Sequence, residues 1–308
     1  MLGYNHQYTG VTKLLVYGIT LLSAVVSTQI ATAETVMEKV ARTGVLTAGT
    51  SKDALPFAYA DDKDELVGYS VDMLTLIHQQ LEKELGREIE LKLVALQPKD
   101  RIPQLVDHKV DIVCDASSFT WKRDQKIDFS VSYGITGTRL LVKQDDYLNL
   151  SQSLAGKKIG VLQGTTNELA IRKAEPGAEI VTVGDRASGY LALEKGEIDA
   201  FAGDGILFES WLQITNHAEE FAILGYYSKE GIACMIPENN SQFLNNVNYT
   251  LIRFMQSFLA DDINSLVLFD RWFGFQGIVP LTEDLRELMI ENMQLIVDFK
   301  EEIPVDEL

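Results

Sequence analysis

Short apolar runs alternate with amphipathic segments along most of the chain, which is the pattern of an α/β protein with mostly parallel sheets. Each run spans four to six residues and is bounded by polar residues, as buried strands are. The runs that we predict as strands are 45–48, 89–94, 110–114, 159–162, 179–183, 199–202 and 232–236.

Between these runs, apolar residues recur at the spacing of an amphipathic helix. The clearest case is a helix that Ser70 caps and Gly86 ends, because these residue types favour the two helix termini. Its apolar positions are Val71, Leu74, Ile77, Leu81 and Leu85. Further helices are predicted at 102–106, 186–195, within about 242–272, and at 282–299.

The alternation restarts after Lys157, so two α/β lobes fit the pattern better than one long sheet. Two strands that cross between the lobes, near 134–139 and 225–233, would suit a hinge. The first lobe would then be discontinuous in the sequence. We expect a first lobe in 34–137, a second in 138–231, and a return to the first lobe with C-terminal helices in 232–308.

The first 33 residues contain no acidic residue and one lysine, followed by an apolar run at 14–26 and the ending Ala31-Thr32-Ala33. This pattern predicts a secretory signal peptide that is cleaved after Ala33. A membrane anchor is the alternative, but it needs ~20 apolar residues, and this run is shorter. We therefore expect residues 1–33 to be removed and the mature protein to be periplasmic.

Charge and cysteine content narrow the range of partners. Twenty-seven basic and 45 acidic residues leave a formal net charge of −18, which repels the phosphates of nucleic acids and anionic lipids. Nucleic acid is therefore not an expected partner. The two cysteines, Cys114 and Cys234, form no C-x-x-C motif, and they leave open either one disulfide or two buried thiols.

Motifs of covalent and metal chemistry are absent from the sequence. There is no G-x-S-x-G elbow, no H-E-x-x-H, no Walker loop and no G-x-G-x-x-G. We predict no catalytic residue, no metal site and no cofactor.

Several segments, in order along the chain, resemble the solute-binding proteins of polar amino-acid ABC transporters, family 3. The resemblance covers nearly all of residues 40–275. It implies a two-lobed type II periplasmic-binding-protein fold with a discontinuous first lobe and two crossover hinge strands. The segments that carry it are Leu66-Val67-Gly68-Tyr69-Ser70-Val71-Asp72, Asp100-Arg101-Ile102-Pro103-Gln104-Leu105, Ser117-Ser118-Phe119-Thr120-Trp121-Lys122-Arg123, Ile127-Asp128-Phe129-Ser130, Leu154-Ala155-Gly156-Lys157-Lys158-Ile159-Gly160-Val161, Gly164-Thr165-Thr166, Gly196-Glu197-Ile198-Asp199-Ala200 and Arg271-Trp272-Phe273-Gly274.

Within this family, the sequence is most similar to the glutamate/aspartate-binding branch. The likeness rests on Asp100-Arg101-Ile102-Pro103, Gly137-Thr138-Arg139-Leu140-Leu141, Ala233-Cys234-Met235 and the additional helix after Pro280. It implies that the ligand is a polar, acidic amino acid.

The resemblance assigns roles to residues of both lobes. Arg123 would hold the α-carboxylate of the ligand with its planar guanidinium, assisted by Ser118 and by backbone groups near Ala116. Alternatively, Arg123 lies on the surface. Thr165 and Thr166 would form an anion-binding corner at a helix start, or they would only cap that helix.

Asp204 would accept the α-ammonium, since it follows a strand at the edge where open α/β sheets bind ligands. Arg101 and Arg186 would provide cations for an acidic side chain. Ser51 stands where acidic-ligand binders commonly have an arginine. Either the adjacent Lys52 would substitute for it, or the ligand is a different polar amino acid.

The expected function is binding of glutamate or aspartate in the periplasm and delivery to an ABC transporter permease, by a monomer without enzymatic activity. Two alternatives stay open. One is a periplasmic cyclohexadienyl or arogenate dehydratase-like enzyme, and the other is the ligand-binding component of a sensor.

Overall fold

The computed structural model describes residues 34–300 and 303. The predicted signal peptide, residues 1–33, lies outside the described residues. Within the described part of the chain, no helix combines the length and the apolar character that crossing a membrane requires.

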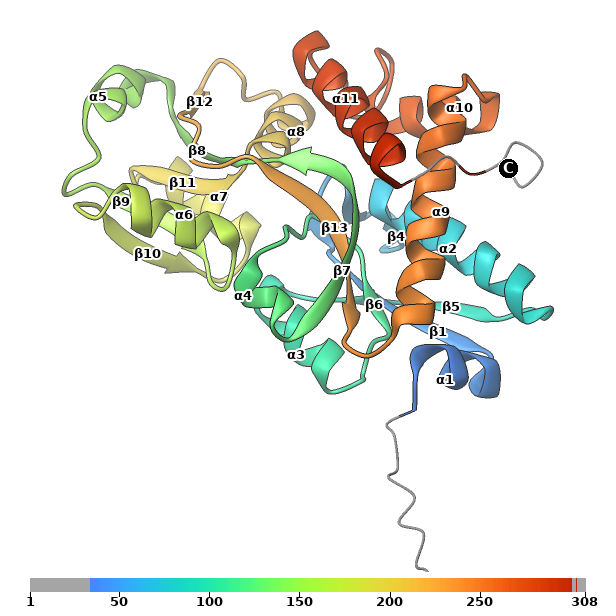
Figure 1. Ribbon diagram of the computed structural model, residues 1–308. Helices are drawn as coiled ribbons and strands as arrows, with labels where there is room; N and C mark the ends of the chain where they lie inside the picture. Colours follow the sequence, from blue (N-terminus) through green and yellow to red (C-terminus); the bar gives the residue numbers. More distant parts are fainter. Residues whose placement is uncertain (1–33, 301–302, 304–308) are drawn as a thin grey trace, which may run out of the picture. The chain divides into compact units, whose positions relative to one another are not determined.

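The first sheet combines strands from both ends of the chain (Figure 1). Its order is β5-β1-β6-β13-β7, and β1 pairs in parallel with β5 and β6, while β13 is antiparallel to β6 and β7. The last strand in the sequence, β13, therefore lies in the same sheet as the first strand, β1. The bounds are β1 Val45–Thr50, β5 Glu90–Ala95, β6 Ile112–Val113, β7 Ile127–Thr136 and β13 Glu230–Pro237.

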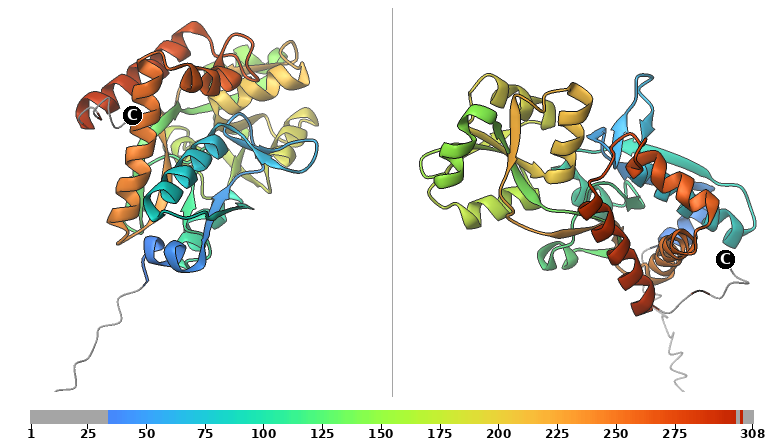
Figure 2. Two further views of the ribbon diagram at one scale, coloured as in Figure 1. Left: turned by 90° about the vertical axis from the view of Figure 1, so that its right-hand side faces the viewer. Right: turned by 90° about the horizontal axis from the view of Figure 1, so that it is seen from above.

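Helices from the N- and C-terminal thirds of the chain share one apolar core with this sheet. The predicted positions Leu74, Ile77 and Leu81 on α2 are fully buried, and each such side chain stabilises the fold by about 1.5–3 kcal/mol. Helix α9 packs against α2 and β7 (Figure 2). The bounds are α1 Val36–Thr43, α2 Tyr69–Leu85, α3 Arg101–Val106, α4 Trp121–Asp124, α9 Ser241–Leu259, α10 Ile263–Phe273 and α11 Glu283–Lys300, with the 3₁₀ turn η1 at Pro98–Asp100 and a small sheet of β2 Asp53–Ala54, β3 Ala58–Ala60 and β4 Leu66–Val67.

The second sheet has the order β10-β9-β11-β8-β12, with β10, β9 and β11 parallel and β8 antiparallel to β11 and β12. Separate apolar clusters form its core. The fold is therefore mixed α/β with two lobes. The bounds are β8 Thr138–Lys143, η2 Gln144–Asp146, α5 Tyr147–Gln152, β9 Lys158–Leu162, α6 Thr166–Ala174, β10 Glu179–Val183, α7 Arg186–Glu194, β11 Ala200–Asp204, α8 Gly205–Thr215 and β12 Phe221–Leu224.

The chain passes between the sheets twice, and the two passages run side by side. Gly137 separates β7 from β8, and a Cβ atom at this position would lie 2.1 Å from the carbonyl oxygen of Ser228 on the other passage. Only glycine allows this approach. The backbone N–H of Thr138 donates to the Ser228 hydroxyl at 2.8 Å, and the N–H of Tyr227 donates to the Thr138 carbonyl at 3.0 Å. The lobe boundaries at 137/138 and 231/232 stay predictions.

The cysteines form a disulfide, which decides between the two alternatives that the sequence left open. Cys114 follows β6 and Cys234 lies in β13, and their Cα atoms are 4.3 Å apart. Both side chains are completely buried. The bond therefore ties the N-terminal part of the first sheet to the strand that returns from the second.

Several predicted element boundaries were wrong, among them the start of the helix at Ser70 and the extent of the strand at 110–114. Helix α2 begins at Tyr69 after Gly68, and Ser70 does not cap it. The Ser70 hydroxyl is instead 2.8 Å from the Tyr133 hydroxyl inside the first core, because tertiary packing supplies a buried partner. The strand predicted at 110–114 forms ladder pairs only at Ile112–Val113.

Candidate ligand-binding site

Polar side chains gather where strands of both sheets end. Ser51 follows β1, Asp115 follows β6 and Asp204 ends β11. Ligands of open α/β sheets bind at the carboxyl ends of the strands. Because the two edges face each other across the hinge passages, charges from both lobes act on one another here. The pKa of Arg101 responds first to burial and then to Asp115, and also to Arg186, Asp53 and Asp204.

Arg101 lies at the start of α3 and is held in a buried ion pair. Its Nε lies 2.7 Å from Oδ2 of Asp115, and both side chains are almost fully buried. Nη2 donates to the Ser51 hydroxyl at 2.8 Å, and Nη1 donates to the Ser117 hydroxyl at 3.3 Å. Burial lowers the pKa of Arg101, while the adjacent Asp115 opposes that shift.

Arg123 lies in α4, and its contacts are with carbonyl oxygens. Nη1 donates to the Ser118 carbonyl at 2.7 Å, and Nη2 donates across to the Gly164 carbonyl of the second lobe at 3.0 Å. In the part of the chain that the structure describes, no carboxylate forms an ion pair with it. Burial lowers the pKa of Arg123, and Arg101 lowers it further.

Arg186, the first residue of α7, pairs with the other lobe. Its Nη1 donates to Oδ1 of Asp53 at 2.6 Å, and only 7% of the arginine side chain is exposed. Although burial alone would lower the pKa of Arg186, Asp53 and Asp204 raise it above its ordinary value. This contact is a charged bridge between the lobes.

Asp204 is 5% exposed, and no cation forms an ion pair with it among residues 34–300 and 303. Its Oδ1 accepts from the Thr136 hydroxyl at 3.3 Å. Burial raises the pKa of Asp204 to about 6, with a further contribution from Glu230, while Arg186 and the side chain of Asn167 oppose the rise. Within the described part of the chain, the carboxylate of Asp204 therefore lacks a positively charged partner in direct contact.

Among the described residues, Arg123 and Asp204 thus remain without an opposite charge in direct contact, as does Glu230 at the start of β13. Arg123 extends from the first lobe and Asp204 from the second, and Asp204 is one of the carboxylates that act to raise the pKa of Arg123 against the effect of burial. Buried charges are normally paired. A molecule that carries both a carboxylate and an ammonium group would supply the two missing partners.

The remaining predicted site residues form no ion pair within the cluster, as far as the described residues extend. Ala116 and Ser118 are buried, and Ser118 offers its carbonyl to Arg123. Thr165 is the N-cap of α6, because its hydroxyl accepts from the Glu168 N–H at 3.2 Å and donates to the Leu162 carbonyl at 2.7 Å. The Thr165 hydroxyl therefore caps the helix, which is the alternative to anion binding that the sequence left open.

Thr166 is the first residue of α6 and is half-buried. Lys52 is exposed, next to the inter-lobe residue Asp53. The pKa of Asp185, at the start of α7, is lowered chiefly by hydrogen bonds with Ser188 and to a smaller extent by Lys52. The lysine thus lies near the edge of the second lobe.

Sequence reasoning missed the acidic partners of both paired arginines, Asp53 and Asp115. Asp115 directly follows a buried strand, which is the signal that identified Asp204, so the same rule would have found it. Asp53 carries no such signal. Glu230 was also missed: its Oε1 accepts from the Ser228 and Thr138 hydroxyls, and its Oε2 is buried without a hydrogen-bond partner.

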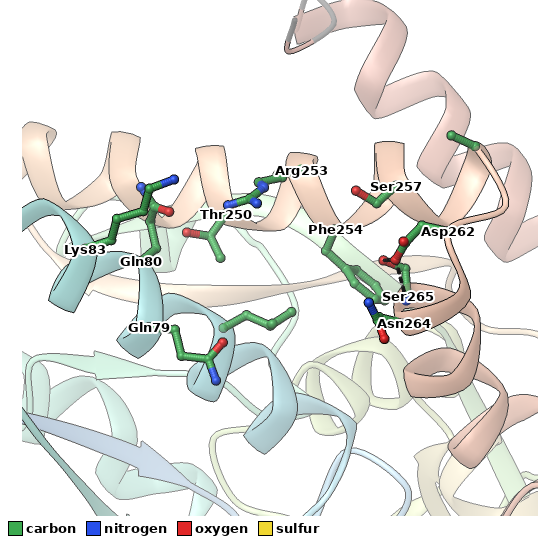
Figure 3. Close-up of a pocket in the computed structure, with 12 residues that line it drawn as sticks. Gln79, Gln80, Lys83, Thr250, Arg253, Phe254, Ser257, Asp262, Asn264 and Ser265 are labelled. Atoms are coloured by element: carbon green, nitrogen blue, oxygen red, sulfur yellow. Dashed lines mark hydrogen bonds between the residues drawn. The ribbon is translucent and has the colours of Figure 1, made fainter. Parts of the chain in front are cut away.

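Two hollows are relevant to the choice of site. One of about 490 Å³ lies between η1, α3, α4 and the start of α6, and its lining includes Arg101, Arg123 and Gly164 but not Asp204. Another of about 600 Å³ lies between α2, α9 and α10 (Figure 3) and contains none of the predicted site residues. In the part of the chain described, no cluster of three or more histidine, cysteine or acidic side chains is arranged to hold a metal ion.

Comparison with known proteins identifies the family. Residues 46–275 match the model of the bacterial extracellular solute-binding proteins, family 3. The chain belongs to this family. Family 3 is thus confirmed as the group that the sequence motifs indicated.

Individual relatives support this assignment. The glutamate/aspartate import solute-binding protein of Salmonella typhimurium is 28% identical over 268 residues, which cover 85% of this chain and 87% of that protein. The L-cystine-binding protein TcyJ of Escherichia coli is 28% identical over 78% of this chain and 87% of that protein. The crystal structure of a cysteine-binding protein from Campylobacter jejuni matches with a TM-score of 0.68 at 22% identity, covering 80% of this chain and 96% of that chain, which shows the common fold.

Proposed function

We propose that this family 3 protein binds a free polar α-amino acid between its two lobes, in the periplasm, and delivers it to the permease of an ABC transporter as a monomer. The observation that carries the proposal is the presence of one partly buried guanidinium, Arg123, and one buried carboxylate, Asp204, neither of which has an opposite charge in contact within the described residues. The names of the relatives add support, because each describes a binding protein for an amino acid.

The chemistry of the ligand follows from these two groups. An α-amino acid has a carboxylate and an ammonium group on the same carbon, and both must leave water when the lobes close around them. Arg123 would bind the carboxylate through two parallel N–H donors, which a lysine side chain does not provide. Asp204 would accept the ammonium group with help from Thr136.

Glutamate and aspartate are the ligands that the sequence resemblance and the name of one relative suggest, before the charges around Arg101 are taken into account. The Salmonella relative favours them by name, and Arg101 is the cation that the sequence resemblance assigns to an acidic side chain. The cystine-binding relative is as similar in identity, so the names alone do not decide the side chain. Direct binding measurements on a panel of amino acids decide it.

The proposal is tested by calorimetric titration of the mature protein with each of the common amino acids. We expect at least one polar amino acid to bind. We expect Arg123→Ala to weaken the binding free energy by about 2–5 kcal/mol, which is roughly 30-fold to several thousand-fold in the dissociation constant, because the carboxylate of the ligand is left buried without its partner. Arg42→Ala is the matched control, since Arg42 pairs with Glu34 on the exposed surface of α1. Binding of no amino acid, or equal effects of both variants, would refute the proposal.

An enzymatic function is the second candidate, and the raised pKa of Asp204, about 6, is the observation that favours it. A buried acid of this kind is able to donate a proton to a leaving group. We propose binding without a covalent step, so no aromatic product is expected from prephenate or arogenate. A sensor component would bind the same ligands and differs only in the protein on which it docks.

A further inference from the structure

Asp115 is a fully buried carboxylate in direct contact with Arg101, the cation expected to recognise an acidic side chain. The role argued for it below rests on the proposed binding of an amino acid. It concerns the side-chain end of the ligand and is independent of the recognition of the ammonium and carboxylate groups by Asp204 and Arg123.

The contacts of Asp115 form a closed network. Oδ2 lies 2.7 Å from Nε of Arg101 and accepts from the Ser51 hydroxyl at 3.1 Å, while Oδ1 accepts from the Ser117 hydroxyl. The two hydroxyls in turn accept from Nη2 and Nη1 of Arg101. Nη1 and Nη2 of the guanidinium therefore each donate to a hydroxyl that is bonded to this carboxylate, while Nε lies in ion-pair contact with the carboxylate without a hydrogen bond of its own.

The second candidate cation is neutralised in the same way, because Arg186 pairs with Asp53 at 2.6 Å. Arg123 is the remaining arginine of the cluster and is partly buried, and the α-carboxylate of the ligand binds it in the proposed function. A second carboxylate on the ligand would therefore meet no unpaired arginine. It would also approach Asp115 in a buried site, where like charges repel strongly.

We propose that Asp115 is a specificity-determining residue, because it keeps Arg101 in a neutral ion pair. The site then accepts an α-amino acid with an uncharged hydrogen-bonding side chain, such as an amide or a hydroxyl, in preference to a dicarboxylic amino acid. The hydroxyls of Ser51 and Ser117 provide neutral groups beside the pair. Specificity here depends on a repulsive group as well as on attractive ones.

Glutamine and glutamate provide the sharpest test, because they have nearly the same shape and differ by one charge. The ratio of their dissociation constants is measured by calorimetry at pH 7.5. We expect the wild-type protein to bind glutamine more tightly than glutamate, and Asp115→Asn to shift the ratio toward glutamate by at least about tenfold. Asparagine keeps the size of the side chain and an acceptor for the serine hydroxyls but removes the charge.

Asp111→Asn is the matched control. Asp111 is also buried and precedes the same strand, but its carboxylate pairs with Lys39 at 2.6 Å and accepts from the Thr47 N–H at 2.9 Å, away from the site. We expect it to lower thermal stability and to leave the glutamine-to-glutamate ratio unchanged. A shift in the ratio equal to that of Asp115→Asn would overturn the assignment.

The outcomes separate the inference from the proposed function. Tighter binding of glutamate by the wild-type protein overturns the inference and leaves the proposed function standing, and this result does not require the variant to fold. If no amino acid binds, the proposed function fails. The neutralisation of Arg101 by Asp115 is then tested separately, by measuring the thermal unfolding of the protein with and without malonate. Malonate should then stabilise Asp115→Asn, in which Arg101 lacks its counter-ion, more than it stabilises the wild-type protein or Asp111→Asn; equal effects overturn the inference.

Discussion

Arg101, Arg123 and Arg186 are the same residue type and lie in one cluster, yet their neighbours give them different chemistry. Arg101 and Arg186 are neutralised by Asp115 and Asp53, whereas Arg123 contacts only carbonyl oxygens. Desolvation makes an unpaired buried charge costly, so the group without a counter-ion is the one most able to gain from a ligand. At the residue scale, ligand binding therefore depends on which charged side chains have no counter-ion within the protein.

Asp204 leads to a prediction about pH. Its pKa, about 6, is raised by burial, and its ionised form is the one that attracts an ammonium group. As the pH falls below about 6, protonation removes that charge, so we expect the dissociation constant to rise by up to about tenfold per pH unit, while affinity reaches a plateau above pH 7. Titrations between pH 4.5 and 8 measure this, and the profile of Asp204→Asn should be weak and flat. An affinity of the wild-type protein that is independent of pH across this range would contradict the role of Asp204.

Short elements at the lobe edges carry most of the contacts that bridge the lobes. β2 provides Asp53 and the start of α7 provides Arg186, while α4 reaches the loop before α6 through Arg123 and Gly164. A residue near the end of an element is well placed for this, since its side chain extends beyond the packed core. These polar contacts stabilise the approach of the lobes together with Ile206 and Leu207 of α8, which belong to the apolar cluster of the first sheet.

Asp53→Asn should weaken closure without unfolding either lobe. A charge-assisted hydrogen bond of this type contributes about 1.5–3 kcal/mol, so its loss should shift the unliganded protein toward open forms and reduce ligand affinity. Small-angle X-ray scattering would show an increased radius of gyration without ligand that returns to the wild-type value at saturation. Asp62→Asn is the control, because Asp62 is exposed in the charged hairpin between β3 and β4. Identical scattering from all three proteins would show that the pair does not stabilise closure.

The molecule as a whole is held together by four apolar clusters, one of which includes residues of both lobes, and by a disulfide. The disulfide between Cys114 and Cys234 closes a loop with a sequence separation of 120 residues, which includes the whole second sheet. Cross-linking such distant positions restricts the unfolded chain and favours the folded one. The bond also adjoins Asp115, so it anchors part of the candidate site to β13.

Removing the disulfide should therefore lower stability more than a typical core substitution. For the double variant Cys114→Ser and Cys234→Ser, we expect the free energy of unfolding to fall by about 2–4 kcal/mol. Denaturant unfolding of the oxidised wild-type protein, the reduced wild-type protein and the double variant measures this. The reduced protein should match the double variant, and equal stability of all three would show that the bond contributes little.

The sequence by itself determined the order and type of most elements, the mixed α/β class and the family. Hydrophobic periodicity carries this information because it reflects local backbone geometry, as at 179–183, where the predicted strand and β10 coincide. Even Arg123 and Asp204 were identified as candidates from motifs and from position at a strand end. Ser70 marks the limit of such reasoning, because a buried partner on β7, Tyr133, replaced the local capping role.

Only the tertiary structure decided the pairing of charges and of cysteines. Arg186 and Asp53 are 133 positions apart in the chain, and Cys114 and Cys234 are 120 apart. No local pattern encodes such distances, because they are set when two sheets and their connecting strands pack in three dimensions. Electrostatic interactions depend on separation in space and on burial, so the choice of which arginine stays available for a ligand belongs to the folded molecule.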